Sequence, residues 1–531
     1  MAQLTIDMSG KAGLCQKWWG DSYLGATAKP QLRILGKEGE IAGGLYNPFK
    51  RYGYLNAGSN TFSGVNADGG DPNTLIGATI YDIVNDDAYF AEAGQELYKG
   101  DGLNDVALEA AVDYGADATI HDLEIYQVND VRKLFTIYKD SSGDTEIGIS
   151  DLPYDTSDDN LTWLTGTVSG AFSNSLINMA FMRVADNGFG YLFMDNQVHK
   201  IDGTADGGAN GTITPNVLLF PANFQLTDAC DYRGYVFIAL RKDVADQLGN
   251  NINAKSQNSE CGIYVWNRST TTFGNADYIP LNGVKDIRKI WVSPQGDLRI
   301  MTTNSDRITQ IRTYNGSTFK VIKTVGYLAS PFYHDGLTTH DLMTTWYGQD
   351  GNIYSHGQIT EDDNEALYNI GRPSVINSSG AILFGGDLYS SAGLYISSII
   401  TAAASPKIYK WKWNDNTSAT PHKGDVYTLV KYLPQMSTVK YVDVYCRPAG
   451  TGTGTIATIK VYFNQSSTAG FTHNVTLNEA GRGYVRLNID KSFVNSIQLE
   501  TEFSTTVALT GDTDFSPSFA VVNFEATSTK G

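Results

Sequence analysis

The chain has 531 residues, of which 57 are acidic and 39 are basic, so its formal net charge at pH 7 is −18. A field of this sign repels phosphate backbones, which excludes nucleic acid as the main partner. The sequence contains no apolar stretch of roughly 18 residues, the length that spans a bilayer. The segment Met1 to Lys11 also lacks the basic region and apolar core of a secretory signal. We therefore expect a chain without a membrane segment that folds in a reducing cytosol.

The composition predicts β-structure. Charged residues make up only 18% of the chain, and it contains 54 glycines and 31 tyrosines. A low charge fraction combined with many Gly, Tyr, Thr, Ser and Asn residues is typical of sheets and turns rather than of helix bundles.

The cysteines and histidines carry no recognisable metal or redox motif. No CxxC pair occurs, which argues against a zinc ribbon, a disulfide scaffold and a redox site. His334 and His340, with Asp335 and Asp341 beside them, are spaced more widely than most zinc ligands. We predict no metal and no cofactor. The four cysteines are scattered along the chain: Cys15, Cys230, Cys261 and Cys446.

Residues 1–74 are predicted to form an extended N-terminal arm and a linker. Apolar alternation is weak here, and Ser59 to Asn73 is rich in Gly, Asn and Asp, as linkers are. The segment Ala42 to Leu55, AGGLYNPFKRYGYL, has the character of an arm whose aromatic side chains contact a neighbouring molecule. Packing of this segment on its own chain is the alternative. The candidate assembly contacts are aromatic residues of this region: Trp18, Trp19, Tyr46, Phe49, Tyr52 and Tyr54.

Residues 75–414 are predicted to form a β-propeller with six or seven blades. Apolar residues recur with period two in short runs bounded by turn residues. The clearest unit, Ile287 to Ile322, has four such runs separated by PQGD, NSD and YNGS. The intervals between units fit blades of about 40–50 residues, lengthened by polar insertions. An array of β-sandwiches is the alternative, and Gly102 to Gly115 is the best candidate for a helix. The first tips of the units lie near Asn85, Asn129, Asp186, Asp231, Gln295 and Asp350.

Residues 415–531 are predicted to form an antiparallel β-sandwich. A polar junction, Asn414 to Asp425, separates this region from the propeller. Longer alternating runs follow, with GTGTG and NEAGRG between them as turn signals. The predicted strands are Val439 to Cys446, Ala457 to Phe463, Gly483 to Ile489, Asn495 to Phe503 and Pro517 to Ala526. The expected fold is therefore all-β, with an arm, a propeller and a sandwich.

No familiar catalytic motif occurs in the sequence. GxSxG, HExxH and the P-loop are all missing. Glycoside hydrolysis uses two carboxylates set across a cleft, whereas adjacent acids in a turn point apart. We interpret the acidic pairs as solvated turn residues and expect no enzymatic activity. Convergence of distant acids on a central pocket stays open as the alternative. The pairs are Asp86 with Asp87, Asp158 with Asp159 and Asp362 with Asp363.

Three further segments have two interpretations each. Asn66 to Asp71 and Asp140 to Glu146 cluster oxygen ligands around Gly but do not match a calcium-binding EF-hand loop, so polar turns are favoured. Trp411 and Trp413 would share one face of a strand. That face is either part of a core, which is the favoured interpretation, or an aromatic surface for sugars.

The C-terminal module resembles one found in bacteriophage tail proteins. The N-terminal segment Ile41 to Leu55 is also similar to segments that open β-rich phage tail proteins. The resemblance rests on features in a fixed order: a strand with Tyr441, Val442, Val444 and Tyr445, then IKVYF (Ile459 to Phe463), GRGYVRLNI with Arg486, SIQLETEF (Ser496 to Phe503) and SPSFAVVNFEA (Ser516 to Ala526).

This resemblance implies a structural component of a bacteriophage virion, most simply of its tail, that acts through protein–protein assembly without catalysis. The expected partners are other tail proteins and copies of the chain itself, since tail proteins assemble in symmetric copies. The expected location is the virion, after assembly in the host bacterial cytoplasm. The alternatives are a propeller glycoside hydrolase or depolymerase, and a tail fibre protein that binds a host receptor or glycan.

Overall fold

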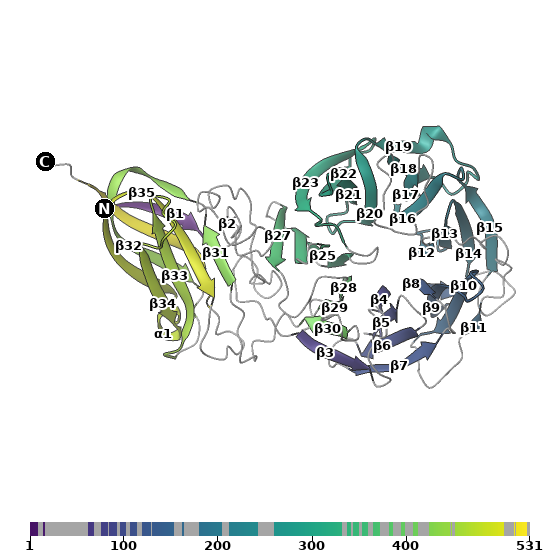
Figure 1. Cartoon of the computed structure of the whole chain (residues 1–531), viewed down its shortest axis with the longest axis horizontal. Helices are drawn as coiled ribbons and strands as arrows, with labels where there is room; N and C mark the ends of the chain where they lie inside the picture. The colour runs from purple at the N-terminus through teal and green to yellow at the C-terminus, as the bar shows by residue number, and fades with distance from the viewer. Residues whose placement is uncertain are drawn as a thin grey trace.

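The computed structural model is almost entirely β-structure and has two parts, a ring of small sheets and a sandwich (Figure 1). The all-β fold predicted from the sequence is confirmed. No helix among the described residues is long and apolar enough to cross a membrane. The structure describes residues 1–8, 14–15, 62–67, 76–113 with short gaps, 119–152 apart from 129, 162–163, 180–203, 212–242, 260–331, 337–371 with short gaps, 382–385, 394–398, 407–411, 424–446 apart from 429, 448, 452–503, 515 and 517–527.

Five antiparallel sheets of four strands each follow one another around the ring. Within each sheet the strands pair in chain order, as the alternating runs separated by turn residues predict. The first sheet contains β8 (Thr119–Val128), β9 (Val131–Lys139), β10 (Thr145–Asp151) and β11 (Thr162–Trp163). The second contains β12 (Ala180–Val184), β13 (Gly190–Met194), β14 (Gln197–Asp202) and β15 (Thr212–Leu219). The third contains β16 (Phe224–Tyr232), β17 (Tyr235–Lys242), β18 (Glu260–Trp266) and β19 (Tyr278–Leu281), with the 3-10 turn η2 (Asn275–Asp277) before its last strand. The fourth contains β20 (Val284–Val292), β21 (Leu298–Asn304), β22 (Ile308–Tyr314) and β23 (Phe319–Tyr327), and the fifth β24 (Leu337–His340), β25 (Met343–Tyr347), β26 (Ile353–Gly357) and β27 (Ala366–Gly371).

An eight-stranded sheet completes the ring by joining its first and last strands. The strand β3 (Phe62–Ala67), which the sequence placed in a linker, pairs antiparallel with β30 and parallel with β7. Only two residue pairs join β3 to β7, so the predicted count of six or seven blades stays a prediction. The other strands are β4 (Ile76–Asp82), β5 (Asp87–Glu92), β6 (Glu96–Asp101), β7 (Ala107–Asp113), β28 (Ile382–Gly385), β29 (Leu394–Ser398) and β30 (Lys407–Trp411).

The helix predicted for Gly102 to Gly115 is wrong. The described part of this segment is β7, which pairs antiparallel with β6. Its apolar residues fit a helical period and an alternating period almost equally well over so short a run. Hydrogen bonding to β6 and β3 then decides in favour of the strand.

One polar segment in the ring is a turn, as the sequence analysis interpreted it. In the hairpin between β9 and β10, the Asp140 carboxylate accepts hydrogen bonds from the backbone N–H groups of Ser142 and Asp144, at 2.9 and 2.8 Å. Gly143 has φ of +91°, a conformation that glycine adopts at no steric cost. The oxygen atoms of this segment therefore organise the turn.

The sandwich contains strands from both ends of the chain. The N-terminal strand β1 (Ala2–Asp7) pairs with β36 (Pro517–Ala526), and β2 (Leu14–Cys15) pairs with β31 (Gly424–Thr428). Residues 2–7, which we had assigned to an extended arm, are therefore an edge strand of the sandwich. The alternation Leu4, Ile6, Met8 explains the difference, because it presents an apolar face that this sheet covers. The remaining elements are β32 (Lys431–Cys446), β33 (Thr455–Phe463), β34 (Phe471–Thr476), the short helix α1 (Leu477–Ala480) and β35 (Tyr484–Phe503).

Two long strands of the sandwich change direction part-way along their length. Register shifts in β32 fall between Tyr432 and Ser437, where it pairs with β35. In β35, Asp490 and Phe493 have positive φ angles of 47° and 60°. Before this bend β35 pairs only with β32, and after it with β33 and β31 as well, so the irregular residues carry one strand between two layers.

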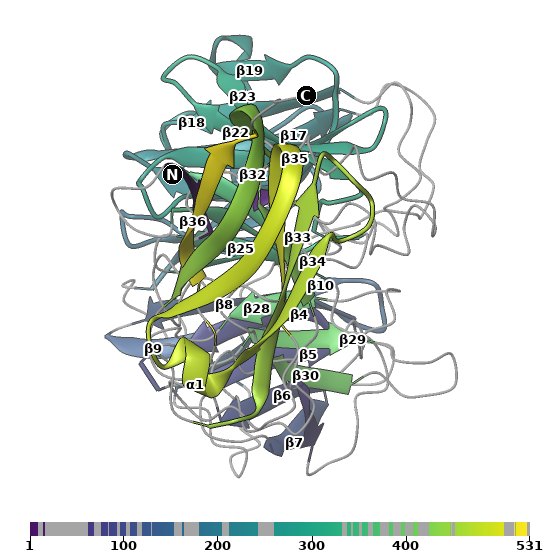
Figure 2. The same ribbon diagram turned by 90° about the vertical axis from the view of Figure 1, so that its left-hand side faces the viewer.

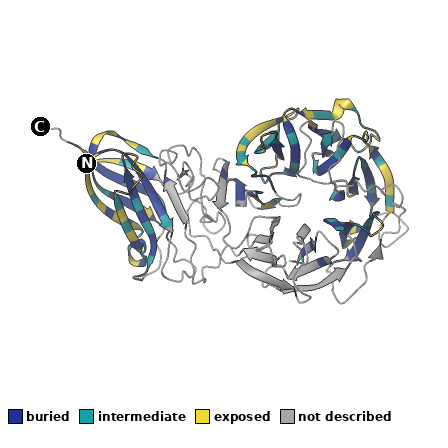
Figure 3. Ribbon diagram, viewed as in Figure 1, coloured by how far each residue is buried: buried dark blue, intermediate teal, exposed yellow. Residues whose placement is uncertain are grey.

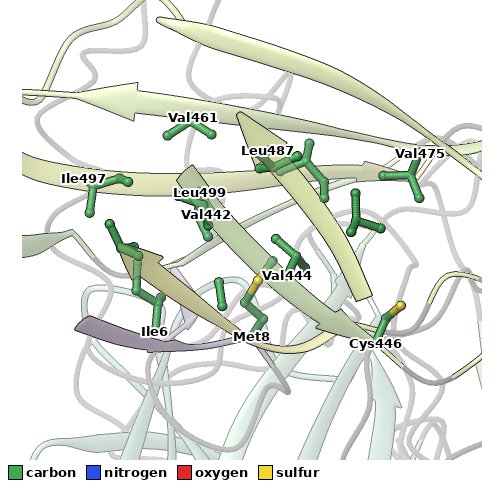
Figure 4. Packing of buried hydrophobic residues seen from close by; sticks show 14 of the residues in the cluster. Ile6, Met8, Val442, Val444, Cys446, Val461, Val475, Leu487, Ile497 and Leu499 are labelled. Atoms are coloured by element: carbon green, nitrogen blue, oxygen red, sulfur yellow. The ribbon is translucent and has the colours of Figure 1, made fainter. Parts of the chain in front are cut away.

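The sandwich has one apolar core, to which the N-terminal strand contributes (Figure 4). Ile6 and Met8 pack there with Val442, Val444 and Leu487, and all five side chains are almost completely buried. In the ring, apolar clusters lie between successive sheets, as with Ile137 and Ile149 against Met182 and Leu192. Figure 3 shows that the exposed residues lie mainly at hairpin tips and outer strands of the described ring.

The contribution of β1 to the sandwich gives a direct test. Replacing Ile6, which is 1% exposed, by Ala removes buried methylene groups and leaves a cavity. We expect Ile6→Ala to lower the free energy of unfolding of the sandwich by about 2–5 kcal/mol, measured by chemical denaturation. Thr5→Ala, one position away on the exposed side of the same strand, is the matched control and should change it by less than about 0.5 kcal/mol. Equal stabilities of the two variants would contradict the assignment of β1.

Candidate functional site

Charged side chains on the first strands of four successive sheets form one connected cluster, which we call the inner-strand network. It comprises Asp122 and Glu124 on β8, Arg183 on β12, Asp228 on β16 and Lys289 on β20. These first strands lie against one another from sheet to sheet and face the middle of the ring (Figure 1).

Asp122 joins the first sheet to the second. Its Oδ2 accepts a hydrogen bond from the backbone N–H of Met182 at 2.7 Å and one from Arg183 Nη1 at 2.9 Å. Glu124, two residues further along β8, brings its Oε2 to 3.8 Å from the same Nη1. One guanidinium therefore lies between two carboxylates of the preceding strand.

Asp228 repeats this arrangement one sheet further around the ring. Its Oδ1 accepts from Arg183 Nη2 at 3.0 Å, and its Oδ2 accepts from the backbone N–H of Ile290 at 2.8 Å. Lys289 Nζ lies 3.9 Å from that second oxygen. The side chains of Asp228 and Asp122 are 0% and 3% exposed, so both negative charges are held where water is scarce.

A third buried carboxylate links the eight-stranded sheet to the next. Asp82, at the end of β4, accepts from both terminal nitrogens of Arg132 on β9 and from the backbone N–H of Val84 at 3.0 Å. Burial alone would raise the pKa of Asp82, but the hydrogen bonds from Arg132, Val84 and Asn85 together hold this pKa below its usual value. The ionised form is therefore the one that the fold stabilises.

The network is first of all an electrostatic link between sheets. A buried carboxylate is stable only when cations and N–H donors replace the water that it loses. Each of these three aspartates bonds to a neighbouring sheet, so the sheets are fixed in order and spacing. Glu124, with a side chain 20% exposed, is the most accessible carboxylate of the network. Chemically it is the group there that could accept or donate a proton to a bound molecule.

Sequence reasoning missed this network because it concentrated on adjacent acids in turns. The available signal was a single Asp inside an apolar strand, as in Ile120 to Leu123 and Leu226 to Ala229. A lone acid in a buried run must be paired, since charged residues are almost never fully buried otherwise. Both aspartates also follow a register shift in their strand, which sequence periodicity does not reveal.

Most residues singled out from the sequence fall outside what the structure describes. The side chains of Asp87, Trp411 and His340 are not described, although each lies on a strand, β5, β30 and β24 respectively. No group of three or more His, Cys, Asp and Glu side chains gathers as metal ligands among the residues that were described. The candidate assembly contacts Trp18, Trp19, Tyr46, Phe49, Tyr52 and Tyr54 also lie outside the described residues, as do Asp86, Asp158, Asp159, Asp362, Asp363, His334, Asp335, Asp341 and Trp413.

Comparison with known proteins gives similarity at the level of solved structures only. No protein-family model and no curated protein matches the chain. Among solved structures it is similar to an exo-β-1,3-galactanase from Phanerochaete chrysosporium, with 8% identity and a TM-score of 0.31 over 88% of this chain and 99% of that one. A glycoside hydrolase family 43 arabinoxylan arabinofuranohydrolase from Bacillus subtilis gives 9% identity and a TM-score of 0.28, over 86% of this chain and 96% of that one. The β-propeller domain of Cps50 (Swd1) from Myceliophteria thermophila gives 8% identity and a TM-score of 0.39, over 66% and 99%.

The expectation that the chain is not an enzyme is withdrawn. Two of the three proteins are enzymes by name, a galactanase and an arabinofuranohydrolase. The expectation of no catalysis had rested on missing sequence motifs, which do not reveal acids brought together from separate strands. We therefore do not carry it forward.

Two buried histidines in the ring are neutral at pH 7. His199 on β14 accepts a hydrogen bond at Nδ1 from the backbone N–H of Asn216 at 3.1 Å, and burial lowers its pKa to about 4. His356 on β26 has its Nδ1 3.3 Å from Arg299 Nη1. Burial, followed by the positive charges of Arg299 and Lys323, lowers the pKa of His356 to about 3.

The inner-strand network predicts a large effect of removing its shared cation. Arg183→Met keeps an unbranched, flexible side chain but leaves the Asp122 and Asp228 carboxylates without their common guanidinium. We expect the free energy of unfolding of the ring to fall by about 2–5 kcal/mol, measured by chemical denaturation. The control is Lys242→Met, whose partner Glu260 is 68% exposed, and it should cost about 1 kcal/mol or less. A cost for Arg183→Met no larger than that of the control would contradict the structural role of the network.

The neutral histidines predict a loss of stability in mild acid. The unfolded chain takes up protons at both residues as the pH falls below about 6.5, whereas the folded ring does not until about pH 4 or lower. Stability contributed by the neutral rings is thus present above pH 6.5 and is lost towards pH 4. Between pH 7 and pH 5 we expect a loss of about 2 kcal/mol for each histidine. His199→Asn and His356→Gln should each flatten this pH dependence, and a dependence unchanged in both would refute the explanation.

Proposed function

We propose that the chain is a structural component of a bacteriophage tail that acts through protein–protein assembly. The observation that carries the proposal is the organisation of the sandwich. The C-terminal segments that resemble tail proteins fall on β32, β33, β35 and β36, and β1 from the other end of the chain completes their sheet. The remaining part, the ring, is inserted between these two ends. Such a chain has one part made from segments near both ends of the sequence and a second part made from the residues between them.

Contacts between the sheets of the ring support the same proposal. Asp82, Asp122 and Asp228 each bond across to a neighbouring sheet, which resists sliding of one sheet past another. A component that transmits load within a particle needs such fixed spacing. In a tail the ring and the sandwich would contact different neighbours.

Electron microscopy of purified particles that carry a tagged copy of the chain tests the proposal. Gold label bound to the tag should appear on the tail of intact particles. The chain should also remain with the particles through density-gradient centrifugation. The proposal would be wrong if the chain were recovered only in the soluble fraction of the lysate and the particles were unlabelled.

Glycoside hydrolysis is a second candidate function, favoured by the position of Glu124. This partly exposed carboxylate lies beside the buried Asp122 and on the same cation, in a strand that faces the middle of the ring. Hydrolysis of a glycosidic bond needs one carboxyl group that exchanges a proton and a second carboxylate near it. Release of reducing sugar from host polysaccharide, lost in Glu124→Gln but retained in the exposed control Glu260→Gln, would favour this function. No release by the unmodified chain would reject it.

A further inference from the structure

One sheet face of the sandwich points away from the apolar core, and we call it the outer face. It is formed by alternate residues of three adjacent strands, opposite in direction to the side chains of the apolar core. Figure 2 shows these strands, β36, β32 and β35, side by side in front of the ring. The outer face comprises Tyr441, Asp443 and Tyr445 on β32, Tyr484, Arg486 and Asn488 on β35, and Phe519, Val521 and Asn523 on β36.

One row of the outer face is aromatic. Tyr445 lies directly opposite Tyr484 on one side and Phe519 on the other. Its ring stacks on that of Phe519 with centroids 4.6 Å apart and an interplanar angle of 16°, and the Tyr484 ring centroid is 6.2 Å away. The three side chains are 37–43% exposed despite their size. An ordered group of large aromatic residues that remains open to water marks an interaction surface.

The orientation of the Tyr445 and Phe519 rings favours a protein rather than a sugar as the molecule that binds the outer face. Because Tyr445 and Phe519 stack face to face across the sheet, their rings stand on edge and turn their faces to each other. A sugar ring needs an open aromatic face, whereas a protein surface packs against edges as well. Tyr, Phe and Arg together are also the residue types enriched in protein interfaces.

The charges of the outer face favour a second copy of this chain as the binding partner. Asp443 and Arg486 are the only charged residues among its nine positions, and they form a bidentate pair at 2.7 and 2.9 Å. The Arg486 guanidinium also lies over the Tyr441 ring, 4.3 Å from its centroid. These nine positions therefore carry no net charge, although the whole chain carries −18. Copies of so acidic a chain repel one another over most of their surface, and a neutral face removes that repulsion locally.

We propose that two copies of the chain associate through the outer face, sheet against sheet. A two-fold axis parallel to the strands, between β32 and β35, would place β32 of each copy over β35 of the other. Asp443 of one copy then lies opposite Arg486 of the other, twice over, as a self-complementary contact requires. This inference goes beyond the proposed tail function and does not depend on it.

Sedimentation of the purified full-length chain over a range of concentrations tests the contact. We expect a monomer–dimer equilibrium whose dissociation constant rises at least about tenfold in Tyr445→Ser/Tyr484→Ser. The matched control is Tyr235→Ser/Tyr327→Ser on the ring, where the two tyrosines are 47% and 45% exposed, and it should leave the constant unchanged. Unchanged thermal unfolding of both variants shows that they are folded. A chain that stays monomeric at every concentration, or a dimer insensitive to the outer-face variant, would overturn the proposal.

A charge exchange tests the predicted orientation. Arg486→Asp alone should weaken the dimer, because it places two negative charges opposite each other. Asp443→Arg/Arg486→Asp restores a pair both within each chain and between copies, so it should restore dimerisation. Failure of the folded exchange variant to dimerise would refute this geometry.

If the unmodified monomer instead bound to a neutral polysaccharide resin and the tyrosine variant did not, the occupant would be a glycan and the proposal would be wrong.

Discussion

The structure depends on one constraint, that the backbone N–H and C=O groups along the edges of β30 and β36 are satisfied by a further strand. Both parts of the chain meet it with a strand from the N-terminal region. In the ring, β3 pairs with β30 and touches β7, so the first and last strands are joined. In the sandwich, β1 covers the edge of β36 and brings Ile6 and Met8 into the core. The N-terminal region is therefore shared between the two parts, and each is complete only after most of the chain has been made.

Within the ring, a second constraint fixes how successive sheets stack. Apolar packing tolerates small displacements of one sheet relative to the next, because methyl and methylene groups have no preferred partner. Buried carboxylates do not tolerate such displacements, since Asp122 and Asp228 must each bond to a guanidinium and to one particular backbone N–H on the next sheet. The apolar clusters supply most of the stabilisation, and the charged contacts supply the alignment.

The sequence predicted what is local and missed what joins distant segments. Alternating apolar runs and turn residues were enough for the all-β class and for single sheets such as Val284–Tyr327, where all four strands are consecutive. The pairing of β3 with β30 spans more than three hundred residues, and no local pattern in Phe62–Ala67 distinguishes a closing strand from a linker. The inner-strand network was missed for the same reason. Asp122, Arg183 and Asp228 come from three separate sheets, and only their common fold shows that they share one set of hydrogen bonds.

The distribution of charge connects the fold to assembly. Among the described residues, Asp140 is an acid that lies in a turn and organises its hairpin. The acids of the inner-strand network are paired with Arg183 and Lys289. The outer face of the sandwich carries a single compensated pair among aromatic side chains. Repulsion between copies of the acidic chain falls off within a Debye length at physiological salt. A chain of this kind keeps copies apart in most orientations and allows close approach in the few where neutral faces meet, which is how an acidic protein can associate with a defined geometry.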